Sequence, residues 1–284
     1  MPCQTSLRQL ANRLYVVAVD LDTGESVKFG APGYVDPAVG VRALDVPQGR
    51  IDGSMGDVHP YGNPHYWFTP ENVEIAVRNI ADGLIQAGKS KNVLLIGAEF
   101  LTRYTDYTDR ATCVLFGDGA GAVVMEACES GDGVLGTYIK SDGSYAELLY
   151  LPGGGSRRPL TEERLRNREQ YVKMKGDGLF KYAVRAMVEA SEAVLRQAGL
   201  TTADIDFLVP HQANLRIIEG VRSRLHVPPE KAIVNIDRVG NTSSASIPIA
   251  LGEARDKGLI KRGDRIVMVA FGGGLTWGAL LLKY

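Results

Sequence analysis

The sequence predicts an α/β protein built from two similar halves, each with helices packed on a mixed sheet. Helical and strand patterns alternate from about residue 180 to the end of the chain. The strand–turn–strand pattern at 268–282 (MVAFGGGLTWGALLL) has a counterpart at 113–125 (CVLFGDGAGAVVM). The segments 71–88 and 241–258 are both helix-like, end in glycine and precede a strand. Repetition of this kind indicates an internal duplication.

Composition narrows the classes of partner. The chain has 284 residues and 45% hydrophobic content, enough for about two domain-sized units with a sizeable core. Its formal net charge is −1. Nucleic acids and anionic membrane surfaces attract strongly basic proteins, so this charge argues against both. We therefore expect a small molecule or another protein as the partner.

Cysteine usage and the apolar segments point to a cytoplasmic protein. The chain has three cysteines, an odd number, and none of them forms a CxxC pair. This usage fits a reducing compartment better than a disulfide framework. The first residues lack the pattern of a secretion signal, and no run of about 18 apolar residues occurs.

The first part of the chain departs from the repeat. Residues 13–30 (RLYVVAVDLDTGESVKFG) predict a hairpin that turns at Asp22, Thr23 and Gly24, and a Gly/Pro-rich stretch follows. We expect four regions: an atypical N-terminal segment, a partial first half, a charged excursion and a complete second half. Their predicted ranges are 1–70, 71–150, 151–173 and 174–284.

The second half has a legible order of elements. Phe180, Val184, Met187, Val188 and Leu195 recur at helical spacing, and Gly199 is a suitable helix stop. The patterns that follow predict, in order, a strand, a helix, a strand, a helix and two final strands. These are expected at 205–210, from Asn214, at 232–236, from about Ser243, at 265–272 and at 275–282.

Polar and glycine residues follow the strands of this half. His211 comes directly after the predicted strand 205–210, Asn241 precedes a predicted helix, and Phe271 to Gly274 form a Gly-rich turn after another strand. Ordinary roles exist for each of them, as a satisfied polar residue, a helix cap and turn formers. Because sites in open α/β sheets are built where strands end, three such elements together favour a functional site.

Five long motifs occur in the sequence: VPHQANLRII (209–218), DRVGNTSSASIPIAL (237–251), AFGGGLTWGALLL (270–282), TDRATCVLFGDGAGAVV (108–124) and SDGSYAELLYLPGGG (141–155). Together they resemble β-ketoacyl-acyl-carrier-protein synthase III, a condensing enzyme of the thiolase fold. The resemblance covers residues 80–284 and implies a thiolase-like, duplicated αβα layered fold with a truncated first half. It also implies decarboxylative Claisen condensation of an acyl-CoA with malonyl-acyl carrier protein in fatty-acid biosynthesis.

The resemblance assigns roles to five residues. His211 and Asn241 would hydrogen-bond the malonyl thioester carbonyl, Gly273 would offer a backbone N–H to an oxyanion, and Phe271 would help to exclude water. His211 must then donate through Nε2, so its other ring nitrogen needs a partner. Arg216 would contact the carrier protein, although a solvated helix arginine is an equal alternative. We expect no cofactor, no nucleic acid and no membrane, and a homodimer remains open.

The nucleophile of the family is missing from the sequence. Such enzymes need a cysteine at a helix N-terminus, where the helix lowers the pKa of the thiol. The duplication places this position at Glu71, and its neighbours Thr69, Pro70 and Asn72 are not cysteines either. Cys113 lies in an apolar strand pattern that predicts a buried, inert thiol. We therefore expect impaired condensation, with decarboxylation of malonyl thioesters as the most the chain could catalyse.

Residues 1–70 contain short pieces that resemble two other families. GDVHPYGNPHYWF (56–68) resembles a loop of periplasmic zinc and manganese solute-binding proteins, which makes His65 and, more weakly, His59 metal candidates. Two histidines fall short of the three or four ligands of a transition-metal site. Residues 13–33 resemble a hairpin of patatin-like lipid hydrolases, but DGSMG lacks the first glycine of a G-x-S-x-G elbow. The sequence therefore reads as a mosaic with a seam at about 79–84.

Two alternatives to the condensing enzyme remain open. One is a metal-binding module that uses His59 and His65. The other is a non-catalytic remnant that binds acyl-CoA or a carrier protein without turnover. Zinc binding and substrate turnover distinguish these classes from each other.

Overall fold

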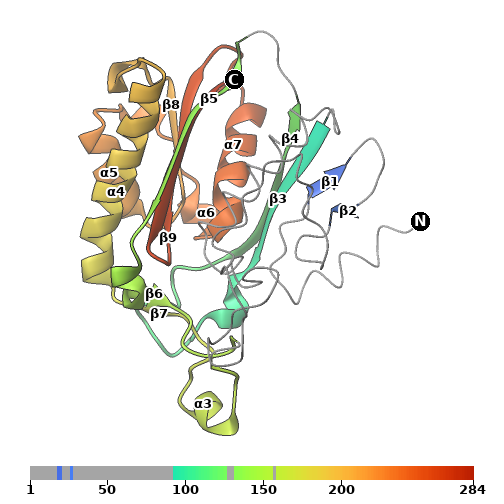
Figure 1. The fold of residues 1–284 in the computed structure, drawn as a ribbon, viewed down its shortest axis with the longest axis vertical. Coiled ribbons are helices and arrows are strands. Elements are labelled where there is room, and N and C mark those ends of the chain that lie inside the picture. Colours follow the sequence, from blue (N-terminus) through green and yellow to red (C-terminus); the bar gives the residue numbers. More distant parts are fainter. Residues whose placement is uncertain (1–17, 21–25, 28–91, 127–130, 156–157) are drawn as a thin grey trace, which may run out of the picture. The chain divides into compact units, whose positions relative to one another are not determined.

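The computed structural model describes residues 18–20, 26–27, 92–126, 131–155 and 158–284 (Figure 1). The chain divides into two compact units. One comprises residues 1–96, 123–127 and 152–170, and the other comprises residues 97–122, 128–151 and 171–284. The candidate site lies in the second unit, which is therefore described in more detail.

The first four-stranded sheet contains the hairpin expected near the start of the chain. Its strand order is β2-β1-β3-β4, with β1 (Ala18–Asp20), β2 (Ser26–Val27), β3 (Asn92–Phe100) and β4 (Asp118–Glu126). Strand β1 pairs antiparallel with β2, so that Ala18 faces Val27 across the predicted turn. The antiparallel pairing expected for the hairpin is thereby confirmed, and the predicted turn residues lie outside the described part of the chain.

The predicted charged excursion contains a short helix. Helix α3 (Glu162–Arg166) begins after Thr161, whose hydroxyl accepts a hydrogen bond from the Arg164 N–H. Arg158 and Glu169 form an ion pair of 2.8 Å beside it. Local capping and pairing therefore give this polar stretch a defined backbone in the absence of a large apolar core.

The second unit is built on a mixed four-stranded sheet of order β5-β10-β9-β8. Strands β8 and β9 are parallel, whereas β10 is antiparallel to both β9 and β5. The predicted mixed sheet is confirmed, and the carboxyl ends of β8 and β9 meet at one edge of it. The strand bounds are β5 Gly133–Ser141, β8 Phe207–Pro210, β9 Arg265–Gly272 and β10 Thr276–Lys283.

Helices cover both faces of this sheet (Figure 1). Helices α4 (Gly176–Gln197) and α5 (Leu215–Arg224) share the larger apolar cluster with Leu208 and Val267. Helix α7 (Ser246–Asp256) shares the smaller cluster with Val209 and Ile266 on the opposite face. Consecutive strand residues therefore point to different helical layers, as the period of two requires.

Helix α4 follows the predicted apolar spacing. Its residues Ala183, Met187, Ala190 and Val194 are fully buried, which places them on one face of the helix. Gly199 ends the helix with φ +68°, and the Leu200 N–H reaches back to the Leu195 carbonyl at 2.9 Å. This is the glycine-terminated pattern that satisfies the last free carbonyls of a helix.

Short elements complete the described part of the chain. The remaining strands are β6 (Leu149–Tyr150) and β7 (Lys173–Met174), which pair with each other. The remaining helix is α6 (Ile236–Val239). The 3-10 turns are η4 (Leu101–Tyr104), η5 (Gly143–Leu148), η6 (Thr202–Asp204), η7 (Pro229–Lys231) and η8 (Ser243–Ala245).

The predicted strand that begins at Cys113 does not form. The segment from Ala111 to Leu115 is a turn, and Cys113 is half-buried within it. Asp109 accepts hydrogen bonds from the Thr112 hydroxyl at 2.9 Å and, through its carbonyl, from the Cys113 N–H at 2.9 Å. Local acceptors thus compete successfully with strand pairing, which is the usual effect of an aspartate that starts a turn.

The predicted strand at 232–236 is also wrong. Only Ala232 forms a bridge there, parallel to Leu208. The N–H groups of Asn235 and Ile236 donate to Oε1 of the buried Gln212 at 2.9 and 3.2 Å. A side-chain amide therefore takes the place of a sheet neighbour, a long-range contact that apolar patterning does not reveal.

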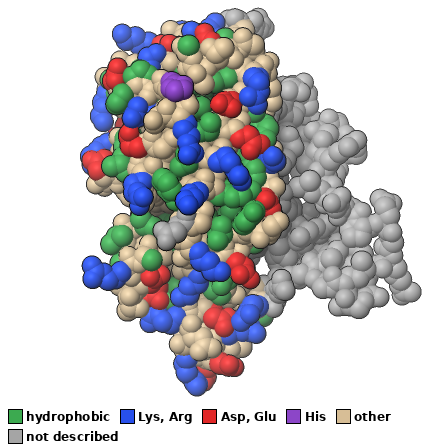
Figure 2. Space-filling model, turned by 90° about the vertical axis from the view of Figure 1, so that its left-hand side faces the viewer, with side chains coloured by type: hydrophobic (Ala, Val, Ile, Leu, Met, Phe, Trp, Pro, Cys, Tyr) green, Lys and Arg blue, Asp and Glu red, His purple; other side chains and the backbone are tan. Residues whose placement is uncertain are grey.

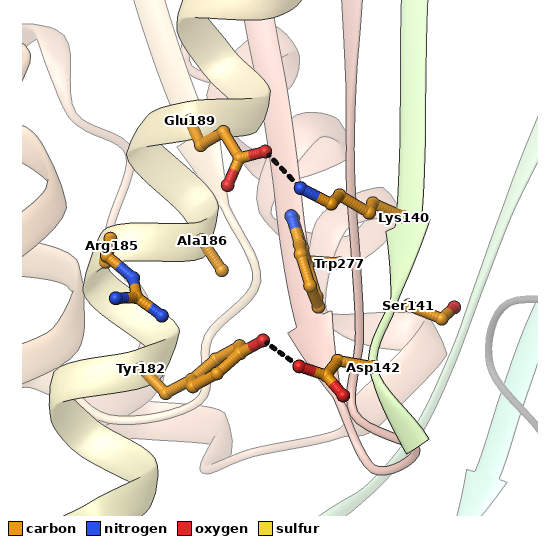
Figure 3. A pocket seen from close by; sticks show the side chains of 8 residues that line it. All are labelled: Lys140, Ser141, Asp142, Tyr182, Arg185, Ala186, Glu189 and Trp277. Atoms are coloured by element: carbon orange, nitrogen blue, oxygen red, sulfur yellow. Dashed lines mark hydrogen bonds and ion pairs between the residues drawn. The ribbon is translucent and has the colours of Figure 1, made fainter. Parts of the chain in front are cut away.

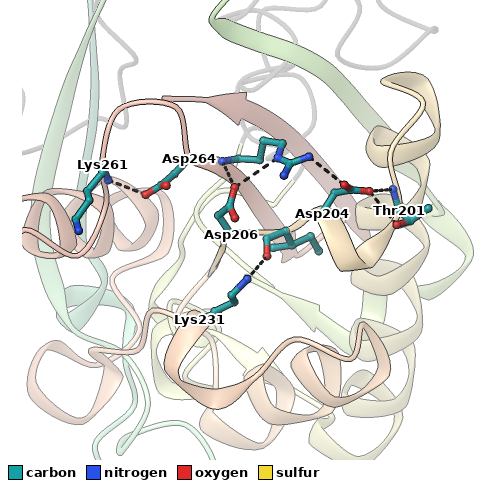
Figure 4. A network of polar contacts seen from close by, with 8 residues as sticks. Thr201, Asp204, Asp206, Lys231, Lys261 and Asp264 are labelled. Carbon is teal, nitrogen blue, oxygen red and sulfur yellow. Dashed lines mark hydrogen bonds and ion pairs between the residues drawn. The ribbon is translucent and has the colours of Figure 1, made fainter.

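A polar network ties the amino ends of β8 and β9 together (Figure 4). Arg265 donates from Nη1 to Asp204 at 3.0 Å and from its backbone N–H to Asp206 at 2.9 Å. Hydrogen bonds from the Thr201 N–H and hydroxyl, with Arg265 beside them, lower the pKa of Asp204. The network lies at the end of the parallel strands opposite to His211.

The surface over α4 and α5 carries basic and acidic side chains interspersed with apolar ones (Figure 2). This mixture agrees with the formal net charge of −1. Among the helices of the described residues, none combines the length and the apolar character that crossing a membrane requires.

The packing of α5 on α4 yields a stability prediction. A Cβ atom added at Gly220 would lie 3.0 Å from Cγ2 of the buried Val184. We expect Gly220→Ala to lower the free energy of unfolding by about 1–3 kcal/mol, because overpacking outweighs the gain in helix propensity. Urea unfolding of Gly220→Ala, Val184→Ala and the double variant measures this effect. The double variant should be more stable than additivity predicts by about 0.5 kcal/mol or more, and strict additivity would contradict the contact.

Candidate functional site

The three strand-end features predicted from the sequence all lie in the second unit. His211 directly follows β8, and its backbone N–H donates to the Val269 carbonyl of β9 at 2.7 Å. Phe271 lies two residues further along β9, which leads into the Gly-rich turn. The parallel pairing of β8 with β9 therefore brings His211 and this turn to the same edge of the sheet.

The imidazole of His211 is buried and held by one contact. His211 is 9% exposed. Ring atom Nδ1 lies 2.6 Å from Oγ of Ser246, the first residue of α7. Burial lowers the pKa of His211 from 6.5 to about 4. The ring is therefore uncharged at neutral pH.

Asn241 is fixed through its backbone and its side-chain oxygen. Its N–H donates to the Leu115 carbonyl at 2.8 Å, and its carbonyl accepts from the Gly117 N–H at 2.9 Å. Its Oδ1 accepts from the Ser243 N–H at 2.9 Å. Among the described residues, none accepts a hydrogen bond from Nδ2. The amide group of Asn241 thus offers its N–H donors to a ligand.

The turn after β9 needs glycine for steric reasons. A Cβ atom at Gly273 would lie 3.1 Å from the Leu149 carbonyl oxygen, and Gly274 adopts φ +144°. The ladder between β9 and β10 ends at Gly272. Within the described part of the chain, the Gly273 N–H has no backbone acceptor. The role of an N–H donor stays a prediction for Gly273.

Phe271 and Gln212 make the surroundings rigid and apolar. Phe271 is 7% exposed, and its ring centroid lies 6.1 Å from that of Tyr182. Gln212 is fully buried and donates from Nε2 to the carbonyls of Pro210 and Ile233. Because Gln212 binds four backbone groups, it fixes the segment that carries His211. Sequence reasoning missed this role, although the residue stands next to His211.

Arg216 lies on the surface at the start of α5. Asn214 caps this helix, since its Oδ1 accepts from the Arg216 N–H at 2.8 Å. The guanidinium group of Arg216 is exposed and lies 5.1 Å from the centroid of the Phe180 ring. This arrangement leaves its N–H groups open to a partner, so both the docking role and the solvated role are compatible with it.

Most of the other candidate residues lie in parts of the chain that the structure does not describe. His59, His65 and position 71 lie outside the described residues. Within the described ranges, no three His, Cys, Asp or Glu residues are grouped so as to bind a metal ion. Cys113 is half-buried in a turn and has no helix N-terminus behind it.

A separate pocket of about 160 Å³ lies between α4, β5 and β10 (Figure 3). Its charged groups are mostly engaged with one another: Lys140 pairs with Glu189 at 2.9 Å, and the Tyr182 hydroxyl donates to Asp142 at 3.0 Å. The indole Nε1 of Trp277 is buried there without a protein acceptor. The pocket is polar and internally compensated, unlike the two uncharged donors of His211 and Asn241.

The geometry around His211 and Asn241 suits one kind of chemistry. Ser246 at the start of α7 holds His211, and Ser243 in the turn before that helix holds Asn241. Nε2 of His211 and Nδ2 of Asn241 have no hydrogen-bond partner among the described residues. Fixed donors in a site with little water stabilise an oxygen atom that gains negative charge during a reaction.

Family models and curated relatives that match this chain all carry the name of one enzyme. The family model for 3-oxoacyl-[acyl-carrier-protein (ACP)] synthase III matches residues 76–143. The family model for the C-terminal part of the same enzyme matches residues 195–284. The β-ketoacyl-[acyl-carrier-protein] synthase III of Caldanaerobacter subterraneus subsp. tengcongensis is 50% identical over 205 residues. That alignment covers 72% of this chain and 62% of the relative.

Solved structures of the same enzyme are also similar to this chain. The crystal structure of 3-oxoacyl-[acyl-carrier-protein] synthase III from Aquifex aeolicus VF5 has 50% sequence identity and a TM-score of 0.66. The alignment covers 74% of this chain and 63% of the Aquifex aeolicus chain. The Thermus thermophilus enzyme has 43% identity and a TM-score of 0.66, with 74% and 64% coverage. The chain thus spans about 62% of the length of the curated relatives that it matches.

The buried state of His211 predicts how stability depends on pH. The unfolded chain binds a proton at this histidine near pH 6.5, whereas the folded protein does so near pH 4. The free energy of unfolding should therefore fall as pH decreases from 6.5 to 4, by about 3 kcal/mol from this group alone. Urea unfolding between pH 7 and pH 4.5 should show a smaller decrease for His211→Gln than for the unchanged protein.

A matched control separates this effect from general acid sensitivity. His226 is exposed and has φ +55°, a conformation that asparagine tolerates. His226→Asn should therefore keep the pH dependence of the unchanged protein. An equal decrease in His211→Gln and His226→Asn would show that His211 is not buried in its neutral form.

Proposed function

Because the chain belongs to the β-ketoacyl-acyl-carrier-protein synthase III family, we propose that it binds malonyl thioesters at His211 and Asn241 and decarboxylates them. The relatives carry the name of a condensing enzyme of fatty-acid biosynthesis, and the described second unit has the thiolase-like α/β architecture expected from the sequence. The proposed substrates are malonyl-acyl carrier protein and malonyl-CoA, with acyl-CoA as the partner in a complete condensation.

The observation that carries this proposal is the pair of unused, uncharged donors. His211 keeps Nε2 free while Nδ1 faces Ser246, and Asn241 keeps Nδ2 free while Oδ1 faces Ser243. Both side chains are 9% exposed. No described residue accepts a hydrogen bond from either atom, so an acceptor supplied by a ligand would complete their hydrogen bonding. A thioester carbonyl oxygen is such an acceptor.

The reaction follows from the charge that this oxygen gains. The bond between the malonyl carboxylate and the α-carbon breaks, CO₂ leaves, and the electron pair of that bond forms a thioester enolate. The negative charge of the enolate is concentrated on its oxygen, where the His211 and Asn241 N–H groups would stabilise it by several kcal/mol in a dry site. Protonation of the α-carbon by solvent then gives an acetyl thioester.

A neutral histidine is the suitable donor for this step. Burial holds the pKa of His211 near 4, so the ring is an N–H donor that does not titrate between pH 6 and 8. A protonated imidazole in the same place would require burial of a charge. The low pKa therefore supports a role in hydrogen bonding to the enolate.

Condensation requires an acyl-enzyme nucleophile that the sequence does not supply at the expected place. The position is occupied by Glu71, and its neighbours are not cysteines. Cys113 is half-buried in a turn, and no described helix begins at it. We therefore propose a protein that releases CO₂ from malonyl thioesters and does not form a new carbon–carbon bond. Arg216 is proposed to contact an acidic carrier protein, because its guanidinium group is exposed beside the site-bearing segment.

Release of CO₂ from malonyl-CoA tests the role of the donors. We expect His211→Ala and Asn241→Ala each to lower the rate on the order of 100-fold, because each removes one donor to the enolate oxygen. His226→Asn, which changes an exposed histidine, should leave the rate unaltered. An undiminished rate in His211→Ala, with the protein folded by circular dichroism, would disprove the assignment.

Intact-protein mass spectrometry after incubation with acetyl-CoA tests the absence of a nucleophile. We expect no acyl adduct, because an activated thiol is missing at the helix that should carry it. Peptide mapping locates any adduct that does form, and Cys113→Ala serves as the control for adventitious acylation. A stable adduct on another residue, formed at the rate of turnover, would restore condensation and contradict this part of the proposal.

A further inference from the structure

Ser246 is the residue that contacts His211 from α7. Its Oγ lies 2.6 Å from Nδ1 of the imidazole, and the serine is 1% exposed. It is the first residue of an 11-residue helix, six positions beyond Gly240 and five beyond Asn241 in the segment GNTSSAS. The contact joins the start of α7 to the carboxyl end of β8.

The direction of this hydrogen bond follows from the acceptors that the Ser246 hydroxyl can reach. A buried O–H group requires an acceptor. Serine in a helix can donate to the carbonyl four residues earlier, as Ser191 does to Met187 at 2.8 Å. Ser246 makes no such bond, and within the described residues Nδ1 of His211 is its only partner. The hydroxyl must therefore donate, and Nδ1 must accept.

An accepting Nδ1 leaves the proton of the neutral ring on Nε2. Among the described residues, none forms a hydrogen bond with this ring nitrogen. The N-terminus of α7 reinforces the arrangement, since the positive end of a helix dipole disfavours a second proton on the ring. The ring is thus oriented by a contact on one side and presents an N–H on the other.

We propose that Ser246 is a positioning residue that fixes His211 as the Nε2–H tautomer and holds its ring in place. The inference rests on the proposed function only in so far as Nε2–H donates to a thioester oxygen. Ser246 does not touch the substrate. It acts through His211, because a ring that flips or changes tautomer would present a nitrogen lone pair to an oxygen atom, and the two would repel each other.

Nitrogen-15 NMR of the imidazole tests this assignment directly, because protonated and unprotonated ring nitrogens have different chemical shifts and couplings to the ring protons. The His211 signal is identified by its loss in His211→Gln. We expect the unchanged protein at pH 7 to show His211 in the Nε2–H form alone. In Ser246→Ala we expect a mixture of both tautomers or exchange broadening, since Nδ1 has lost its donor.

A matched pair of variants separates the hydroxyl from the space that it fills. Ser246→Thr keeps the hydroxyl and Ser246→Val has nearly the same shape without it. Both add the same bulk to a buried position, so their difference reports the hydrogen bond. We expect the threonine variant to retain the single Nε2–H tautomer and the valine variant to lose it. For malonyl-CoA decarboxylation, kcat of the valine variant should be on the order of 10-fold below that of the threonine variant, with little change in KM.

The outcomes distinguish this inference from the proposed function. An Nδ1–H ring in the unchanged protein would overturn the inference, whatever the activity. The same follows if Ser246→Ala and Ser246→Val keep a single, sharp Nε2–H tautomer. If the unchanged protein shows the expected tautomer and Ser246→Val loses it but malonyl-CoA is not decarboxylated, the inference stands and the proposed function fails.

Discussion

The parallel pairing of β8 with β9 is the constraint on which the candidate site depends. It brings the carboxyl ends of both strands to one edge, so that His211 and the Gly-rich turn after Phe271 share that edge. The polar network of Arg265 with Asp204 and Asp206 fixes the opposite ends of the same strands. With both ends held, the register sets where each side chain beyond the strands can lie. The chemistry is then added by side chains from the turn before α7.

Hydrogen bonds to backbone groups explain how a buried polar site remains ordered. Gln212 satisfies four backbone groups around the segment after β8, and Asn241 bridges Leu115 and Gly117 through its own backbone. These contacts hold the backbone around the site, while Nε2 of His211 and Nδ2 of Asn241 have no hydrogen-bond acceptor among the described residues. An excess of uncharged donors favours an oxygen that becomes negative, which connects the packing of the second unit to the proposed decarboxylation.

The spacing of apolar residues along the chain predicted the helices and strands that are set by neighbouring residues. The spacing of Val184 and Met187 and the stop at Gly199 determined α4, and alternating or continuous apolar runs determined β8, β9 and β10. The two strands that were predicted wrongly failed for a common reason: Asp109 and Gln212 bind backbone groups that a strand would have used. The positions of strand ends predicted which residues gather at the site. They did not predict the partner of Nδ1 of His211. Ser246 is distant from His211 in sequence, and GNTSSAS contains three serines that are equivalent until α7 is placed.

The central claim is that two uncharged donors, His211 Nε2–H and Asn241 Nδ2–H, bind the thioester oxygen of a malonyl group. The most direct measurement is NMR of these two N–H groups during titration with a malonyl thioester analogue that cannot lose CO₂. Both resonances should move together to lower field and saturate at one ligand per chain, as two donors to one acceptor require. If the analogue binds while neither resonance moves, the oxygen lies elsewhere and the account of this site is wrong.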